Sequence, residues 1–272
     1  MQNFSPSPRE LIASCWRNHS LILTMVKREV IGRYKGSALG MLWSLFNPIV
    51  MLAIYTFVFS VVFKARWNTD STSKTEFALM LFAGLMVFGL FSECLNRAPT
   101  LILNNTNYVK KVVFPLEILP WISLGSALFH FAVSLFVWLT AYVFLFGTPH
   151  LTIFLLPVVV FPLIMLSMGL GWFLASLGVF LRDVGQVVGV LTSVLMFMSP
   201  IFYPASALPE AYRGYLMLNP LTPIIEDVRR VLFLGDGPDL MQLATSYIVA
   251  LIIFCLGFAW FQKSRKGFAD VL

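Results

Sequence analysis

Few side chains in this sequence could do acid–base or metal chemistry inside its long apolar segments. Of the three histidines, only His130 lies well within such a segment. An ionisable group in hydrocarbon is costly and is by default a functional candidate, and the alternative is a neutral histidine hydrogen-bonded to a neighbouring helix. Glu93 and Glu117 lie near segment ends, where a carboxylate reaches the interface at lower cost, and we interpret both as interfacial or loop-packing residues.

The motifs of common catalytic and nucleotide-binding sites are absent. The sequence holds no Gly-Lys pair and therefore no P-loop for ATP, and it has neither H-E-x-x-H nor G-x-S-x-G. Cys15, Cys94 and Cys255 are far apart without C-x-x-C spacing, which indicates neither a disulfide framework nor a zinc site. We therefore expect no catalytic residue, no metal and no cofactor bound by this chain.

Aromatic side chains offer a different chemistry, because sugars stack their apolar faces on rings. Aromatic residues make up 15% of the chain. Six of them, in two apolar segments, combine ring faces with nearby polar atoms: Trp43, Tyr55, Phe59, Phe197, Phe202 and Tyr203. The alternative is ordinary core packing and an interfacial aromatic belt.

The elements that must position these residues are membrane helices. The chain has 272 residues, of which 58% are hydrophobic and 12% charged, whereas soluble domains are about 25% charged. A spanning helix needs about 20 mostly apolar residues, and six windows qualify. We predict an all-α membrane protein with one transmembrane domain over 1–272 and six transmembrane helices. The windows are 38–63, 77–96, 116–146, 151–181, 184–203 and 240–262.

The distribution of basic residues predicts the orientation. Thirteen of the 19 lysines and arginines lie on the side that holds both termini, and six lie on the other. The positive-inside rule then places both termini in the cytoplasm. Because topogenic loops account for the net charge of +6, we do not expect nucleic acid as a partner.

Three segments do not fit plain connections between spans. Residues 8–31 mix apolar and basic side chains, typical of an amphipathic helix on the membrane interface, and the alternative is a solvated tail. In residues 97–113 the sequence predicts a short helix after Pro99 that docks a soluble partner. The alternative is a simple basic loop. In 204–239, Thr222 is the predicted N-cap of a helix that ends before Gly235, with a shorter helix opening near Pro209. We place this helical hairpin, 204–234, at the outer membrane surface.

Several runs, in order along nearly the whole chain, resemble ABC-2 type permeases. The likeness is strongest to the exporters of polysaccharides and polyol phosphates, which handle O-antigen, capsule and teichoic acid. Each run is weak alone and together they are specific. They are Arg33-Tyr34-Lys35-Gly36-Ser37, Lys110-Lys111-Val112-Val113-Phe114-Pro115, Phe180-Leu181-Arg182-Asp183, Ser199-Pro200-Ile201-Phe202-Tyr203-Pro204 and Asn219-Pro220-Leu221-Thr222-Pro223.

The resemblance implies the permease subunit of an ATP-driven exporter that moves a lipid-linked, O-antigen-like polysaccharide across the inner, or cytoplasmic, membrane. It implies a homodimer joined to two copies of a separate ABC-type ATPase, which binds the ATP and magnesium. A same-fold exporter of a drug or another lipid, a membrane-embedded enzyme of glycan assembly and an unpowered channel remain as alternatives.

The resemblance also implies roles for particular residues. The first and fifth spans would line the substrate path, and the hairpin would form an outer gate at Tyr212, Tyr215, Pro220 and Pro223. Arg28, Arg33 and Lys35 would attract a pyrophosphate head group, or else serve only as topogenic charge. The loop 97–113 would become the coupling helix that contacts the ATPase, through Asn104, Asn105, Asn107, Tyr108, Val109, Lys110 and Lys111.

Overall fold

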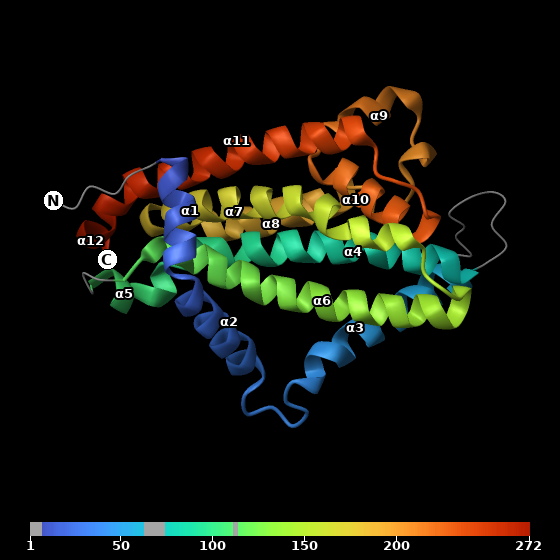
Figure 1. Ribbon diagram of the computed structural model, residues 1–272, viewed down its shortest axis with the longest axis horizontal. Coiled ribbons are helices and arrows are strands. Elements are labelled where there is room, and N and C mark those ends of the chain that lie inside the picture. The colour runs from blue at the N-terminus through green and yellow to red at the C-terminus, as the bar shows by residue number, and fades with distance from the viewer. Residues whose placement is uncertain (1–6, 63–73, 111–113) are drawn as a thin grey trace.

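The computed structural model describes residues 7–62, 74–110 and 114–272, and within these ranges the regular elements are all helical (Figure 1). Long helices run side by side and form the bundle. The central helix is α4, which packs on most of the others. The bundle helices are α4 (Lys74–Arg97), α6 (Leu119–Phe146), α7 (Leu156–Phe180), α8 (Val184–Met198) and α11 (Leu240–Ser264).

Helices α7 and α11 approach each other closely where Gly169 lies against Gly257. A Cβ on either glycine would overlap the main chain of the other helix. Small residues let membrane helices approach in this way. Indole nitrogens add hydrogen bonds across the core, since Trp138 donates to the carbonyl of Leu79 at 2.9 Å.

Five helical segments among the described residues are long and apolar enough to cross a membrane. The fifth predicted window is the exception, because α8 is a helix of only 15 residues. At 1.5 Å per residue it is about 22 Å long, against a hydrocarbon core of about 30 Å. The helix ends at Met198, and residues 199–204 continue without regular structure. These five segments are Leu42–Phe59, Thr75–Thr100, Leu116–Phe146, Leu151–Phe180 and Leu240–Val271.

The predicted helix 8–31 is two helices, α1 (Pro8–Arg17) and α2 (His19–Tyr34), with Asn18 between them. Asn18 is non-helical, and its side-chain amide donates to the carbonyl of Ser14 at 2.8 Å. Such side-chain bonds compete with helical ones, which explains the break. In Figure 1, α1 runs across the bundle axis and α2 runs obliquely along the bundle, against α6.

A tight turn separates α2 from α3 (Leu42–Tyr55), and the two helices form a V on one side of the bundle (Figure 1). Gly36 and Gly40 in this turn have φ of 88° and 53°, a region that favours glycine. After α3 the chain continues as a π-helix, Thr56–Val62. Large apolar side chains on α3 and α8 are exposed, among them Phe46, Ile49, Val190 and Phe197.

The hairpin contains α9 (Glu210–Met217) and α10 (Leu221–Arg229), so the two predicted helices are present. The predicted N-cap is wrong, because α10 begins at Leu221 after Pro220. Thr222 is buried instead, and its hydroxyl donates to the carbonyl of Leu216 at 2.8 Å. A short π-helix, Arg230–Leu234, follows, and Gly235 ends it with φ of 76°, as expected for a glycine after the end of a helix.

The two helices of the hairpin differ in burial. On α9, Tyr212 and Tyr215 are exposed, in line with a surface position. On α10, Ile224, Ile225 and Val228 are buried against α4, α7 and α11. The second half of the hairpin is therefore built into the bundle and does not rest on its surface.

Candidate functional site

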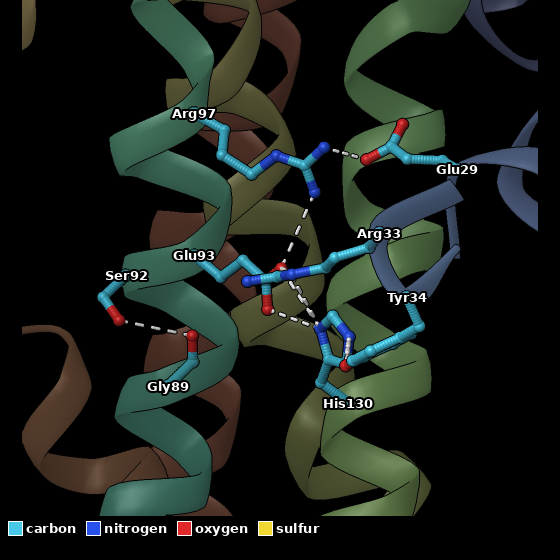
Figure 2. Close-up of polar contacts among 8 residues, drawn as sticks. All are labelled: Glu29, Arg33, Tyr34, Gly89, Ser92, Glu93, Arg97 and His130. Atoms are coloured by element: carbon cyan, nitrogen blue, oxygen red, sulfur yellow. Dashed lines mark hydrogen bonds and ion pairs between the residues drawn. The ribbon is translucent and has the colours of Figure 1, made fainter. Parts of the chain in front are cut away.

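A group of charged side chains joins α2, α4 and α6 within the apolar bundle (Figure 2). The Glu93 carboxylate accepts a hydrogen bond from Arg33 Nη1 at 2.5 Å. Its other oxygen lies 2.9 Å from Nδ1 of His130, and Nε2 of that ring lies 3.0 Å from the Tyr34 hydroxyl. Burial raises the pKa of Tyr34, so its hydroxyl keeps its proton at neutral pH. His130 is therefore hydrogen-bonded to two neighbouring helices, α4 and α2.

Helix periodicity explains how these charges meet. Glu29 and Arg33 are four residues apart on α2, and Glu93 and Arg97 are four apart on α4, so each pair shares one face of its helix. The faces are complementary: Arg33 pairs with Glu93, and Arg97 pairs with Glu29 (Figure 2). Arg97 Nη1 also lies 3.6 Å from Glu93. We call Glu29, Arg33, Tyr34, Glu93, Arg97 and His130 the polar junction.

A cavity of about 360 Å³ adjoins the polar junction, between α2, α3, α4 and α6. The junction supplies charged walls, and Ser44, Asn47 and Ser134 add further hydrogen-bonding groups. The rest of the lining is largely apolar and includes Phe82 and Met86. Such a cavity fits a ligand with an anionic or hydroxyl-rich part and an apolar part.

The three basic residues assigned to a head-group site do not converge. Arg33 lines the cavity. Arg28 faces elsewhere on α2, and its Nη2 donates to the Tyr108 hydroxyl at 3.2 Å. Lys35 follows the last residue of α2 and is exposed. Of the three, only Arg33 lines the cavity at the polar junction, whereas Arg28 lines a separate, smaller cavity beside Leu101 and Asn105.

An ion pair outside the polar junction supports the interpretation of Glu117 as a loop-packing residue. Its carboxylate accepts from Arg265 Nη1 at 2.5 Å and from the Ser14 hydroxyl at 2.9 Å. Arg265 also donates to the carbonyl of Phe114 at 3.0 Å. These contacts tie α1, the 114–118 segment and the C-terminal segment together, and Glu117 is buried among them.

The predicted coupling helix is three short turns, Ala98–Thr100, Leu103–Asn105 and α5 (Thr106–Lys110). The first turn sits on α7, where a Cβ on Gly178 would overlap the main chain of Pro99. Ala98, Pro99 and Ile102 are buried. The segment is therefore firmly seated on the bundle although it is not one helix.

The coupling residues differ in exposure. Asn104 and Asn107 are exposed, whereas Asn105 is half-buried and its amide donates to the carbonyl of Leu101 at 2.8 Å. The Tyr108 ring stacks on Phe114 with centroids 4.1 Å apart. Three further residues complete the predicted set: Val109 is half-buried, Lys110 ends α5, and Lys111 lies outside the described residues.

The structure brings five of the six selected aromatic residues together. Phe59 and Phe202 stack with centroids 6.2 Å apart, and Phe202 also stacks on Phe197 at 5.7 Å. Tyr55 adjoins Phe59 at 6.5 Å, and the Tyr203 hydroxyl donates to the carbonyl of Phe197. This aromatic row joins the end of α3 to the end of α8. Trp43 lies apart, edge-on to Phe46 at 5.3 Å.

Arg229 is a buried residue whose importance we did not infer from the sequence. Its guanidinium donates to the main-chain carbonyls of Met80, Pro200 and Ile201 at 2.9, 2.5 and 2.9 Å, and to the Glu226 carboxylate at 3.1 Å. Burial lowers the pKa of Arg229 to about 10, so it stays charged at neutral pH. Its place on α10, four residues after Ile225 on the buried face, is the signal that sequence reasoning overlooked.

The residues assigned to an outer gate do not form one site. Tyr212 and Tyr215 are exposed on α9. Pro220 and Pro223 line an apolar groove of about 490 Å³ together with α7 and α11. The groove and the polar junction are separate features of the molecule.

The ABC-2 type transporter family matches residues 20–233 of this chain. The O-antigen export system permease protein RfbA of Myxococcus xanthus is 27% identical over 262 residues, which cover 96% of this chain and 98% of that protein. The Klebsiella pneumoniae protein of the same name is 26% identical, over 93% and 95% of the two chains. The polysialic acid transport protein KpsM of Escherichia coli is 29% identical, over 83% and 87%.

Proposed function

The chain belongs to the ABC-2 type transporter family, and from that membership we propose that it is the permease subunit of an ATP-driven exporter of lipid-linked polysaccharide. It is a transport subunit, and not an enzyme. The observation that carries the substrate class is the similarity to O-antigen export permeases, which extends over at least 93% of this chain. Similarity to a polysialic acid transport protein supports the same class.

The exporter would sit in the inner, or cytoplasmic, membrane with both termini in the cytoplasm. The excess of basic residues on that side supports this orientation. In Figure 1, α1 and α12 (Phe268–Val271) lie at one end of the bundle, and α9 lies at the other. Both terminal helices on one side are consistent with an even number of crossings. The sixth crossing would be α8 completed by residues 199–204.

The functional unit would be a homodimer bound to two copies of an ABC-type ATPase. The exposed apolar faces of α3 and α8 are suited to a second copy. The segment 97–113 would contact the ATPase, since Asn104 and Asn107 are exposed there and Pro99 is fixed on α7. ATP and magnesium would bind to that partner alone.

The substrate would pass along α3 and α8. The cavity at the polar junction would admit the head group from the cytoplasmic side, with Arg33 as its cation. The aromatic row of Tyr55, Phe59, Phe202 and Phe197 would give the sugars ring faces further along. The hairpin with α9 and α10 would close the outer end.

Copurification tests this function. The tagged chain is extracted gently from its native membrane, and the proteins and lipids that accompany it in stoichiometric amounts are identified. We expect an ABC-type ATPase and a lipid-linked sugar. Recovery of the chain alone, under conditions in which a control permease keeps its ATPase, would contradict the exporter assignment. An ATPase without any glycan would favour the export of a drug or another lipid.

A further inference from the structure

The guanidinium of Arg33 uses only one of its three nitrogens in contacts with described residues. Its Nη1 contacts Glu93 and lies 3.4 Å from the His130 ring, whereas its Nε and Nη2 donate no hydrogen bond to any residue that the structure describes. The side chain is 52% exposed and lines the cavity. A guanidinium presents a planar fork of donors that matches phosphate oxygens. The free edge of Arg33 is thus available to an anion in the cavity.

Glu93, in contrast, contacts more than one donor group. Besides Arg33, its carboxylate contacts His130 Nδ1 at 2.9 Å and lies 3.6 Å from Arg97. If Arg33 turned away, those two groups would still face the carboxylate, so no buried charge would be left alone. While the pair is closed, Glu93 both neutralises Arg33 and repels any anion that approaches it.

We propose that Glu93 is a resident counter-ion of Arg33 and that the phosphate-bearing head group of a lipid displaces it in this cavity. This inference rests on the proposed function and adds the recognition step. A lipid, and not a free phosphate, is the occupant because the remaining wall is apolar, with Met51, Phe82 and Met86 beside the charged groups. His130 and Arg97 hold the Glu93 carboxylate after the exchange.

Binding of farnesyl pyrophosphate to the purified complex with its ATPase, in lipid nanodiscs without nucleotide, tests the exchange. Inorganic pyrophosphate and farnesol are the comparison probes, and calorimetry gives the dissociation constants. Four variants are compared with the wild type: R33Q, R33K, E93Q and R28Q. R28Q is the matched control, because Arg28 is an arginine of the same helix that contacts Tyr108 and does not line the cavity.

We expect E93Q to bind farnesyl pyrophosphate about tenfold more tightly than the wild type, and R33Q to bind it at least about tenfold more weakly. R33K keeps the charge without the planar fork and should fall in between. R28Q should stay within about twofold of the wild type. Both comparison probes should bind the wild type more weakly than farnesyl pyrophosphate, because each lacks either the prenyl chain or the phosphates.

Unchanged or weaker binding by E93Q would overturn the exchange, and wild-type binding by R33Q would remove Arg33 from the site. Equal affinity for inorganic pyrophosphate would rule out recognition of a lipid. If E93Q does not assemble, E93D supplies the test: its carboxylate is one methylene further from Arg33, and we expect a smaller gain of about threefold.

Copurification and probe binding together distinguish a failure of the exchange from a failure of the proposed function. If the ATPase and a lipid-linked sugar copurify with the chain but farnesyl pyrophosphate does not bind, the exchange fails and the proposed function stands. If neither copurifies while a control exporter stays intact, the proposed function fails, whatever the probe does.

Discussion

Arg229 donates a hydrogen bond to the main-chain carbonyl of Pro200, and its Nη1 lies 2.5 Å from that oxygen. The contact joins α10 to the segment where α8 ends. The last carbonyls of a helix lack intrahelical partners, and here a buried guanidinium serves the carbonyls that follow the end of α8. The same side chain donates to the carbonyl of Met80 on α4, so it connects α10, α4 and the end of α8.

Replacement of Arg229 should destabilise the contacts between α10, α4 and the end of α8. In R229M, three buried carbonyls and Glu226 lose their donor, at a cost of about 1–3 kcal/mol for each group left without a partner. R229K should be intermediate, because one ammonium cannot reach all the carbonyls. Thermal melting of the purified protein measures both. R230M is the control, since Arg230 donates no side-chain hydrogen bond to a described residue; equal melting of R229M and R230M would contradict the assignment.

Gly84 on α4 should not tolerate a side chain. A Cβ there would lie 2.9 Å from Arg229 Nη2, and the hydrogen bonds of the guanidinium prevent it from moving aside. We expect G84A to lower the free energy of unfolding by about 1–3 kcal/mol. In the control G89A, on the same helix, the Cβ meets no atom within 4 Å. G89A should be neutral or gain up to about 1 kcal/mol, and a neutral G84A would show that Arg229 is not fixed.

The pH dependence of stability should depend partly on Asp227. Burial raises its pKa, with the Asp239 and Glu226 charges adding to the effect, while the main-chain NH of Asp239 and the charge of Arg230 oppose it. For a carboxyl whose pKa is raised by folding, the stabilising contribution is complete below its unfolded pKa, near 4, and is lost as the pH rises through the folded value. Melting temperature measured from pH 4 to neutral should therefore fall less steeply in D227N than in the wild type. Asn can still accept from the main-chain NH of Asp239, which lies 3.0 Å from Asp227. Parallel profiles would contradict this prediction.

Association with the ATPase should depend on the ring of Tyr108 more than on its hydroxyl. Y108A removes the stacking on Phe114 and the acceptor of Arg28, so α5 should lose its position. Y108F keeps the stacking. We expect copurification of the ATPase to fall severalfold in Y108A and to stay near the wild-type level in Y108F. The docking role of this segment would be wrong if Y108A copurified as much ATPase as the wild type.

The sequence alone determined the features that depend on local patterns. Hydropathy predicted the helical segments. In a membrane helix all backbone hydrogen bonds form within the segment, so an apolar stretch of sufficient length is enough to predict it. Glycine propensity predicted the end of the hairpin at Gly235. Short runs of residues predicted the family, which the match over residues 20–233 confirmed.

Only the tertiary structure decided how the polar groups are paired. Arg33 and Glu93 are 60 residues apart in the sequence, and Arg229 and Met80 are 149 apart. Local patterns carry no information about partners at such distances, so Arg229 could be counted only as an outer charge and Glu93 only as an interfacial one. The two errors at helix ends have a different cause, because their contacts are local: the Thr222 hydroxyl donates to the carbonyl of Leu216, and the Asn18 amide donates to the carbonyl of Ser14. Each side chain had several possible neighbouring partners, and its type alone does not say which one it takes. A polar side chain adopts the role that its three-dimensional neighbours allow, and those neighbours exist only after the helices have packed.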